Sequence, residues 1–358
     1  MSKFNVNTIT SKSGKNGPVL AGITTVSSTG SMRIPSGPTE QRGGRGRGVF
    51  FGGYEVPSPT AEIQYITIAT KGNGADFGDC RQNISSTGTC ASSTRGISGG
   101  GSTPISPGRT SAIDYVVMSS LGGASTFGEL TTSRRYLAAF NNSTRGVFCG
   151  GNNPSNTPSR ERTIDYITMA STGDASDFGE LGVEAGSGSY LNDDIGGCSS
   201  PTRGLLFGGG SSSNVIQYLT IASLGNTKDF GDLTQGTVRF CAASSNSVRG
   251  INAGGNSPST NGINIMEYVT IATLGNAANF GDLSVARSLL ASCASSTRGI
   301  FAGGYTYPSP SVTYNTIDYV TIVSAGNATD FGDLTYAGQT NGANRSVSGC
   351  SDVNGGLG

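Results

Sequence analysis

The chain has 358 residues, of which 57 are glycine and 13% are charged, with 23 basic and 23 acidic side chains and neither histidine nor tryptophan. Balanced charge argues against a general nucleic-acid or membrane-surface binder, which needs a basic excess, and no stretch approaches the roughly 18 apolar residues that span a bilayer. The absence of histidine excludes a nucleophile–histidine pair and leaves Asp, Glu, Lys and Tyr for acid–base catalysis.

The segment 1–46 lacks the pattern that fills the rest of the chain. Short β-like pieces such as VLAGITTVSS are separated by Gly, Ser, Thr and Pro. This predicts an extended docking or oligomerising arm over residues 1–46, with a disordered tail as the alternative. The start has no apolar core and no cleavage pattern, so we expect no signal peptide. The stretch RGGRGRGVFFGG at Arg42–Gly53 leads into a strand, which favours a linker over a dinucleotide loop or an Arg-Gly-rich RNA-binding segment.

From residue 47 onward the sequence repeats six times. Each copy holds a tyrosine and a later phenylalanine, and the spacing between the two is the same in every copy. The tyrosines are Tyr65, Tyr115, Tyr166, Tyr218, Tyr268 and Tyr319, and the phenylalanines are Phe77, Phe127, Phe178, Phe230, Phe280 and Phe331. Successive copies recur with a period of about 50 residues, which is typical of propellers and other repeat folds.

Four short pieces make up each copy, and each is typical of a β-strand. In chain order they have the forms R..LA.C.SS, TRGxFxGG, xIxYxTIA and DFGDL. The third piece alternates β-branched and aromatic residues, as in YITIAT at Tyr65–Thr70, which suits a pleated surface packed on both sides. Four strands in about 50 residues make one propeller blade. The sequence therefore predicts an all-β, six-bladed propeller over residues 47–358, with four antiparallel strands per blade.

The ends of the repeat predict how the ring closes. The first copy begins directly at its second strand, RGVFFGG, whereas the last copy of the first piece, RSVSGCSD at Arg345–Asp352, has no second strand after it. We expect this C-terminal strand to complete the first blade from the inside. Such closure removes the open edges that invite aggregation.

These pieces resemble the kelch repeat over Arg47–Asp352. VFFGG and IFAGG occupy the diglycine position and IDYVTI the tyrosine strand, while the usual kelch Trp is missing and the Phe of DFGD takes its approximate place. The resemblance implies a propeller and carries over no active site, because kelch propellers serve enzymes and binding scaffolds alike.

Two stretches also resemble bacteriophage structural proteins. These are STGSMRIPSGPTEQR at Ser28–Arg42 and the repeat unit TIDYVTIVSAGNATDFGDL at Thr316–Leu334. The resemblance implies a virion protein made in the host cytoplasm, in a tail fibre or tail-associated appendage and present in several copies. Its partners would be other virion proteins, through the arm, and a host surface receptor or glycan; we expect no nucleic acid and no membrane insertion. The alternatives are a capsid, decoration or head-fibre component, an intracellular kelch-type adaptor, and a propeller enzyme acting on sugars.

Several motifs suggest chemistry, and for each we favour a structural role. Asp-Phe-Gly at Asp76–Gly78 matches a kinase loop, but it recurs in similar form in all six copies and the other kinase motifs are missing. Four of the seven cysteines, Cys90, Cys198, Cys293 and Cys350, share one repeat position that holds Phe140 in another copy, which predicts small buried side chains. Asn192–Asp194 predicts a solvated loop, with a cation site as the alternative. We expect a non-enzymatic protein with no catalytic residue, metal or cofactor.

A ring of ion pairs is a further prediction. Each copy has one arginine before its second strand and one acid after its Phe-Gly, and in a meandering blade these turns lie at the same end. The arginines are Arg47, Arg95, Arg145, Arg203, Arg249 and Arg298, and the acids are Asp79, Glu129, Glu180, Asp232, Asp282 and Asp333.

Variation in loop length predicts the partner-facing side. The distance from the repeat arginine to the repeat tyrosine differs between copies, and the interval Phe178–Cys198 is longer than its counterparts in other copies. Both connections emerge on one face of a meandering blade, and their Tyr, Ser, Asn and Arg are typical contact residues. We predict that this face binds a partner, and tolerated drift of an idle surface is the alternative. The candidate residues are Tyr54, Arg160, Arg162, Tyr305, Tyr307 and Tyr314.

Overall fold

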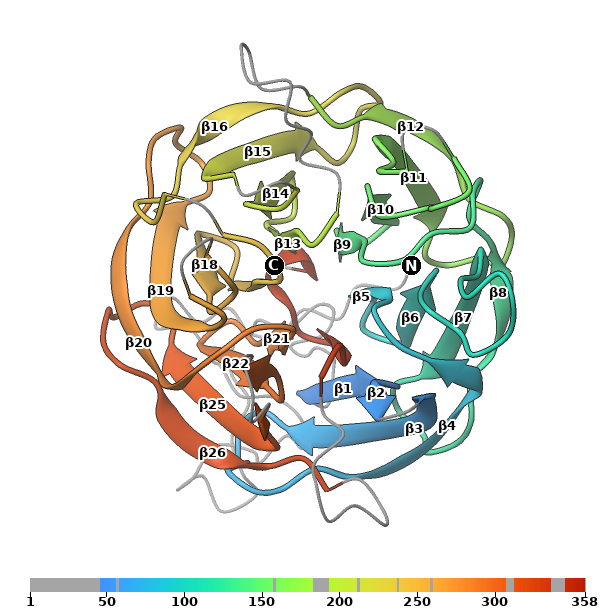
Figure 1. The fold of residues 1–358 in the computed structure, drawn as a ribbon, viewed down its shortest axis with the longest axis horizontal. Helices are drawn as coiled ribbons and strands as arrows, with labels where there is room; N and C mark the ends of the chain where they lie inside the picture. The colour runs from blue at the N-terminus through green and yellow to red at the C-terminus, as the bar shows by residue number, and fades with distance from the viewer. Residues whose placement is uncertain are drawn as a thin grey trace, which may run out of the picture.

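Six four-stranded antiparallel sheets surround one axis in the computed structural model (Figure 1). The structure describes residues 46–55, 58–156, 159–182, 193–210, 213–236, 238–257, 260–306, 312–335 and 345–357. The predicted all-β, six-bladed propeller is confirmed. The predicted N-terminal arm lies outside the described residues except for Gly46. No helix in the described ranges is long and apolar enough to cross a membrane.

The strands form four concentric sets, and blades 1 to 6 are numbered in chain order. The innermost strands are β27 (Ser348–Ser351), β5 (Gly88–Ala91), β9 (Ala138–Asn141), β13 (Gly196–Ser199), β17 (Ala242–Ser245) and β21 (Ala291–Ala294). The second strands are β1 (Arg47–Phe51), β6 (Arg95–Gly99), β10 (Arg145–Cys149), β14 (Arg203–Phe207), β18 (Arg249–Ala253) and β22 (Arg298–Ala302). The third strands are β3 (Ser58–Thr67), β7 (Ala112–Val117), β11 (Thr163–Thr168), β15 (Val215–Thr220), β19 (Ile263–Thr270) and β25 (Thr316–Thr321).

The outer strands lie at the rim of the disc (Figure 1). They are β4 (Ala75–Ile84), β8 (Ser125–Glu129), β12 (Ser176–Glu180), β16 (Lys228–Asp232), β20 (Ala278–Arg287) and β26 (Thr329–Asp333). Short additions are β2 (Tyr54–Glu55), β23 (Tyr305–Thr306), β24 (Val312–Thr313) and the 3₁₀ turn η1 (Gly355–Leu357).

The C-terminal strand closes the ring as predicted. β27 pairs antiparallel with β1, with Gly48 opposite Ser351 and Phe51 opposite Ser348. Blade 1 is therefore built from both ends of the repeat region. Removal of β27 would leave the inner edge of β1 without its hydrogen-bonded neighbour.

The hydrophobic core lies between blades. The described residues form six apolar clusters, and each joins side chains of two consecutive blades. The repeat tyrosine and phenylalanine meet edge-to-face in every blade, with ring centroids 5.9–6.1 Å apart. The constant spacing between them in the sequence therefore reflects one aromatic pair repeated around the ring, a contact that adds to simple area burial.

The six DFG-like stretches hold neighbouring blades together. In each, the carbonyls of the Phe and of the following acid accept hydrogen bonds of 2.7–3.0 Å from main-chain N–H groups in the next blade's turn between third and outer strands. In five interfaces an Asn or Asp of that turn also accepts a bond of 3.0–3.1 Å from the acid's N–H. A Cβ at the Gly between would collide with the turn, for example 2.5 Å from the Gly72 carbonyl oxygen at Gly332. The predicted structural role is confirmed.

The predicted ring of Arg/acid pairs is wrong. The six arginines lie over the tyrosine of their own blade, with the guanidinium carbon 4.2–5.0 Å from the ring centroid. Each also donates from Nη1 to a main-chain carbonyl of the next blade at 2.7–3.2 Å. No salt bridge among the described residues joins them to the six acids, and Glu180 pairs with Arg162 instead. The third strand lies between the two groups, which gives two strand spacings, about 10 Å, across the sheet. They are also offset along it, because Arg47 lies opposite Thr67 and Asp79 opposite Glu62.

A different polar position links the blades. The residue before the repeat tyrosine is buried and polar in every blade: Gln64, Asp114, Asp165, Gln217, Glu267 and Asp318. This side chain bonds to residues just after the DFG-like stretch of the preceding blade. Asp165, for example, accepts bonds from the N–H and the hydroxyl of Thr131. Arg134 adds an ion pair to Asp165 at 2.9 Å and Arg287 one to Asp318 at 3.1 Å, with all four side chains 0% exposed.

The repeated thiols fill hollows left by glycine in the next blade. A Cβ at Gly48, Gly146 or Gly250 would lie 2.5, 2.7 or 3.1 Å from the sulfur of Cys293, Cys90 or Cys198. All seven cysteines are buried. Burial raises the pKa of the Cys350 thiol to about 12, which keeps it protonated and unreactive. The prediction of small buried side chains is confirmed.

Candidate functional site

One face of the disc carries the variable loops, and we call it the loop face. The connections that enter each blade pair there with the loops between second and third strands. The isolated bridges are Tyr54–Arg345, Ser85–Ser102, Arg135–Asn152, Arg239–Asn256 and Ser288–Tyr305, and in blade 4 the Gly210 N–H donates to the Asp193 carbonyl at 2.9 Å. The two connection types therefore share one face, as predicted. The opposite face, here the turn face, carries the short fixed turns.

Six residues around the axis form a closed hydrogen-bonded ring on the loop face. They are Ser86, Tyr136, Asp194, Phe240, Leu289 and Ser346, one per blade, and each N–H donates to the carbonyl of the equivalent residue in the preceding blade at 2.8–3.1 Å. All six have φ between 56° and 63°. Non-glycine residues rarely adopt this left-handed conformation, so the ring of bonds imposes it. We call this ring the mouth of the axial channel.

The channel behind the mouth is narrow and lined by the inner strands. Cavities of about 80, 100 and 60 Å³ follow one another along the axis and share lining residues. Volumes of this size hold several water molecules. Hydroxyl groups line the channel and donate to carbonyls of the neighbouring blade, such as Ser199 to Asn141 at 2.6 Å and Ser245 to Ser199 at 2.8 Å. These bonds join inner strands that have no β-ladder between them.

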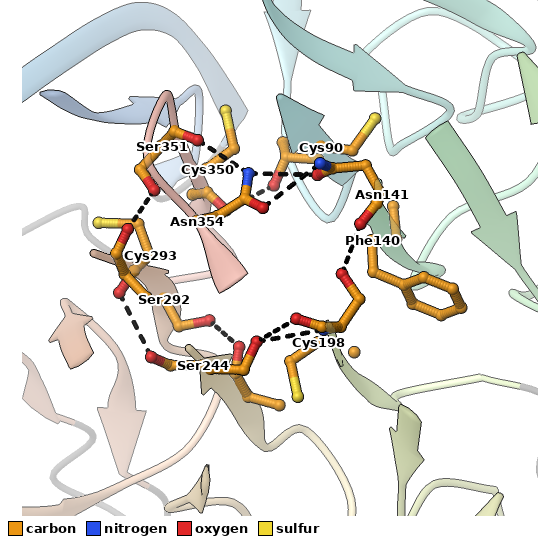
Figure 2. A pocket seen from close by; sticks show the side chains of 18 residues that line it. Cys90, Phe140, Asn141, Cys198, Ser244, Ser292, Cys293, Cys350, Ser351 and Asn354 are labelled. Atoms are coloured by element: carbon orange, nitrogen blue, oxygen red, sulfur yellow. Dashed lines mark hydrogen bonds between the residues drawn. The ribbon is translucent and has the colours of Figure 1, made fainter. Parts of the chain in front are cut away.

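Residues 352–357 close the channel at the turn face. The Asn354 side-chain amide donates to the Ala91 carbonyl at 3.2 Å and to Asn141 Oδ1 at 3.3 Å (Figure 2). Gly356 lies so close to the Asn141 carbonyl oxygen that a Cβ would approach it to 1.8 Å. Figure 2 also shows the sulfur atoms of Cys90 and Cys350 turned away from the cavity. The channel wall therefore offers hydroxyl and amide groups rather than thiols.

The acidic pair of the sequence lies at the mouth of blade 4, where Asp193 is buried, so the predicted solvated loop is wrong for that residue. Asp193 forms an ion pair with Arg160 at 3.1 Å. Burial and the charge of Asp193 raise the pKa of Asp194 well above its usual range, although Arg239, Arg160 and Arg135 act to lower it. In the part of the chain that the structure describes, no group of three or more His, Cys, Asp or Glu side chains is arranged to hold a metal ion. Asn192 lies outside that part.

Five of the six predicted partner-facing residues lie in described loops, in several small groups. Tyr54 and Tyr305 lie on either side of the boundary between blades 1 and 6, where both contact Arg345. Tyr314 bonds through its hydroxyl to Thr306 at 3.2 Å. Arg160 belongs to the Asp193 group, and Arg162 pairs with Glu180 at 3.2 Å and donates to the Leu181 carbonyl. Tyr307 lies outside the described residues. Their role in binding stays a prediction.

Sequence reasoning missed three arginines beside the mouth. Arg135, Arg239 and Arg345 directly precede mouth residues in blades 3, 5 and 1, and each guanidinium stacks on an aromatic ring at 4.6–5.3 Å. The signal was present, because each stands at the same place in its copy, shortly before the Leu, Cys or Val that leads into the inner strand. The left-handed turn that brings them to the mouth has no glycine to mark it.

The comparisons with known proteins give no family assignment. No family model matches the chain, and no curated protein matches its sequence significantly. The resemblance to kelch repeats and to bacteriophage proteins therefore stays a resemblance.

Proposed function

We propose that the protein is a non-enzymatic binding module whose loop face contacts a partner molecule. The observation that carries this proposal is the contrast between the two faces. On the turn face, the turns between third and outer strands are fixed by the inter-blade hydrogen bonds of the DFG-like stretches. On the loop face, loops of differing length carry tyrosines and arginines above a mouth whose backbone is the same in six blades. A rigid scaffold with variable loops is a common arrangement for recognition.

We further propose that this module belongs to a bacteriophage particle, in a tail fibre or tail-associated appendage. The sequence resemblance of Ser28–Arg42 and Thr316–Leu334 supports this proposal. In it, residues 1–46 fasten several copies of the propeller to other virion proteins, and the loop face meets a host surface receptor or glycan or a neighbouring virion protein. The protein would be made in the host cytoplasm and reside in the virion.

Two measurements test the proposal. Mass spectrometry and electron microscopy of purified particles from an infected host would detect the protein in the tail. In the second, Arg162→Ser with Tyr314→Ser alters the loop face, and Leu224→Ser with Leu274→Ser alters turn-face residues that are 57% and 58% exposed. We expect the loop-face pair alone to reduce attachment or incorporation. Loss confined to the turn-face pair would reverse the assignment of the binding face, and absence from particles would reject the virion role.

A further inference from the structure

Arg345 is held between two tyrosine rings at the boundary of blades 6 and 1. Its guanidinium carbon lies 4.6 Å from the ring centroid of Tyr54 and 4.8 Å from that of Tyr305. Tyr54 belongs to the loop after β1 and Tyr305 to the loop after β22. Main-chain bonds fix all three positions, because the Tyr54 N–H donates to the Arg345 carbonyl and Tyr305 exchanges two bonds with Ser288. We call Tyr54, Tyr305 and Arg345 the arginine clamp.

The clamp differs from the six arginines of the repeat. Those also stack on tyrosine, but each donates to a carbonyl of the next blade. Among the described residues, neither a hydrogen bond nor a salt bridge engages the Arg345 side chain, whose contacts are the two rings. The two rings restrain the guanidinium, and among the described residues its N–H donors have no hydrogen-bond partner, so Arg345 can donate to a ligand.

The charge around the clamp favours an anion. Arg135 and Arg239 face the acids of blade 4, whose pKa values they act to lower. Among the described residues, Arg345 forms no salt bridge with those acids, and Asp193 pairs with Arg160 instead. The clamp is therefore a positive group on the loop face whose charge no described carboxylate offsets at salt-bridge distance.

We propose that the arginine clamp binds a carboxylate in an acidic segment of a protein partner. A planar guanidinium matches a carboxylate with two parallel hydrogen bonds, and tyrosine and arginine dominate the energetic centres of protein–protein interfaces. A saccharide ligand would favour open aromatic faces, whereas each ring of the clamp gives one face to the guanidinium. This inference rests on the proposed function and specifies the chemistry of the partner.

A defined peptide tests the clamp on the full-length chain. Fluorescein-labelled hexaglutamate is titrated by anisotropy at low and at physiological salt, with hexaglutamine as the neutral peptide and a uronic-acid oligosaccharide as competitor. Arg345→Gln removes the fork and should weaken hexaglutamate binding about tenfold, the factor that one charge-assisted pair supplies. Arg345→Lys keeps the charge without the fork and should fall between.

The matched control is Arg109→Gln, which removes the same charge from another loop-face arginine, whose two terminal nitrogens already bond to Pro107 and Ser155. It should bind hexaglutamate like the unaltered protein. Thermal melts confirm folding, and Tyr54→Leu with Tyr305→Leu tests the clamp again should Arg345→Gln fail to fold.

Equal affinity of Arg345→Gln and the unaltered protein would overturn the proposal, as would no binding of hexaglutamate. Stronger competition by the uronic-acid oligosaccharide than by unlabelled hexaglutamate would overturn the choice of a protein partner in favour of an acidic glycan. Each result is independent of whether the protein is found in virus particles, so the clamp and the virion role fail separately.

Discussion

Gly332→Ala is the sharpest test of how the blades hold together, because it places one methyl group in the interface that closes the ring. Gly332 has φ +150°, and its Cβ would lie 2.5 Å from the Gly72 oxygen and 2.6 Å from the Gly72 carbonyl carbon. Both atoms are backbone, so the methyl group cannot be accommodated by a side-chain rotation. The turn of blade 1 would have to move away from blade 6.

The size of the effect follows from the bonds that such a movement breaks. Three hydrogen bonds join the Phe331–Asp333 stretch to this turn: Gly72 N–H to Phe331 O at 3.0 Å, Gly74 N–H to Asp333 O at 2.8 Å and Asp333 N–H to Asn73 Oδ1 at 3.1 Å. At about 0.5–1.5 kcal/mol each, they contribute about 1.5–4.5 kcal/mol. A residue forced into a sparsely populated backbone region costs a further ~1–3 kcal/mol. Together these contributions predict that Gly332→Ala lowers the free energy of unfolding by about 2.5–7.5 kcal/mol.

Two glycines in the turns between third and outer strands, Gly275 of blade 5 and Gly326 of blade 6, separate these contributions. Gly275 also has φ +150° but no atom within 4 Å of its Cβ position, so Gly275→Ala should show the backbone cost alone, about 1–3 kcal/mol. Gly326 has open space and no unusual φ, so Gly326→Ala should lie within about 1 kcal/mol of the unaltered protein. Urea titrations followed by tyrosine fluorescence and circular dichroism give the three values. If Gly332→Ala and Gly275→Ala lose the same stability, contact with the next blade's turn is not what restricts Gly332, and the explanation of the DFG-like stretches fails.

Three further predictions concern burial, closure and pH. Asp165→Asn leaves buried Arg134 without its carboxylate and should lower the free energy of unfolding by about 3–5 kcal/mol. Asp114→Asn, whose partner Arg81 is 45% exposed, should lower it by about 1 kcal/mol or less, and equal urea midpoints of the two variants would contradict this. Deleting residues 353–358 opens the channel but keeps β27, so the chain should elute like the unaltered protein, while deleting 345–358 exposes the edge of β1 and should cause aggregation in size-exclusion chromatography. Burial raises the pKa of Cys80 and Cys198 from 9.0 to about 12, so the unfolded chain releases these protons first and stability should fall as pH rises from about 9 to 12; rapid reaction of native thiols with Ellman's reagent at pH 8 would be inconsistent with this.

Regular spacing made much of the fold predictable. Tyr65 and Phe77 recur at one distance because one edge-to-face pair is built six times, and the unmatched strand at Arg345–Asp352 predicted the closure that β27 makes. Cys90 and Phe140 share a position because each faces a glycine of the next blade, Gly146 or Gly204. Side chains that pack in the same way in every copy leave a periodic trace in the sequence.

Interactions with main-chain atoms left no such trace. The repeat arginines and acids were matched by number, but the acceptors of Arg47 and Arg95 are the carbonyls of Met118 and Met169, which have no signature in side-chain identity. The mouth could not be predicted from the sequence for the same reason, because Tyr136 and Leu289 share a left-handed backbone conformation but not a side-chain type. The buried polar position at Asp165 and Glu267, in contrast, recurs in the sequence directly before each repeat tyrosine, so its period alone marks it.

The positions that precede the mouth show why closure and recognition can be separated in this molecule. They are Ser85, Arg135, Asp193, Arg239, Ser288 and Arg345, and the residue after each is held at nearly the same φ by the same ring of bonds. The backbone at these six positions is the same, whereas their side chains are neutral, basic or acidic. Closure of the ring therefore does not require a particular side chain at any of them. The repeat arginines and the DFG glycines, in contrast, are the same in every blade because each contacts the next blade's backbone. A charge at a position that precedes the mouth can therefore change without loss of the fold. Stability alone then does not explain why Arg345 lies over two tyrosines from different blades.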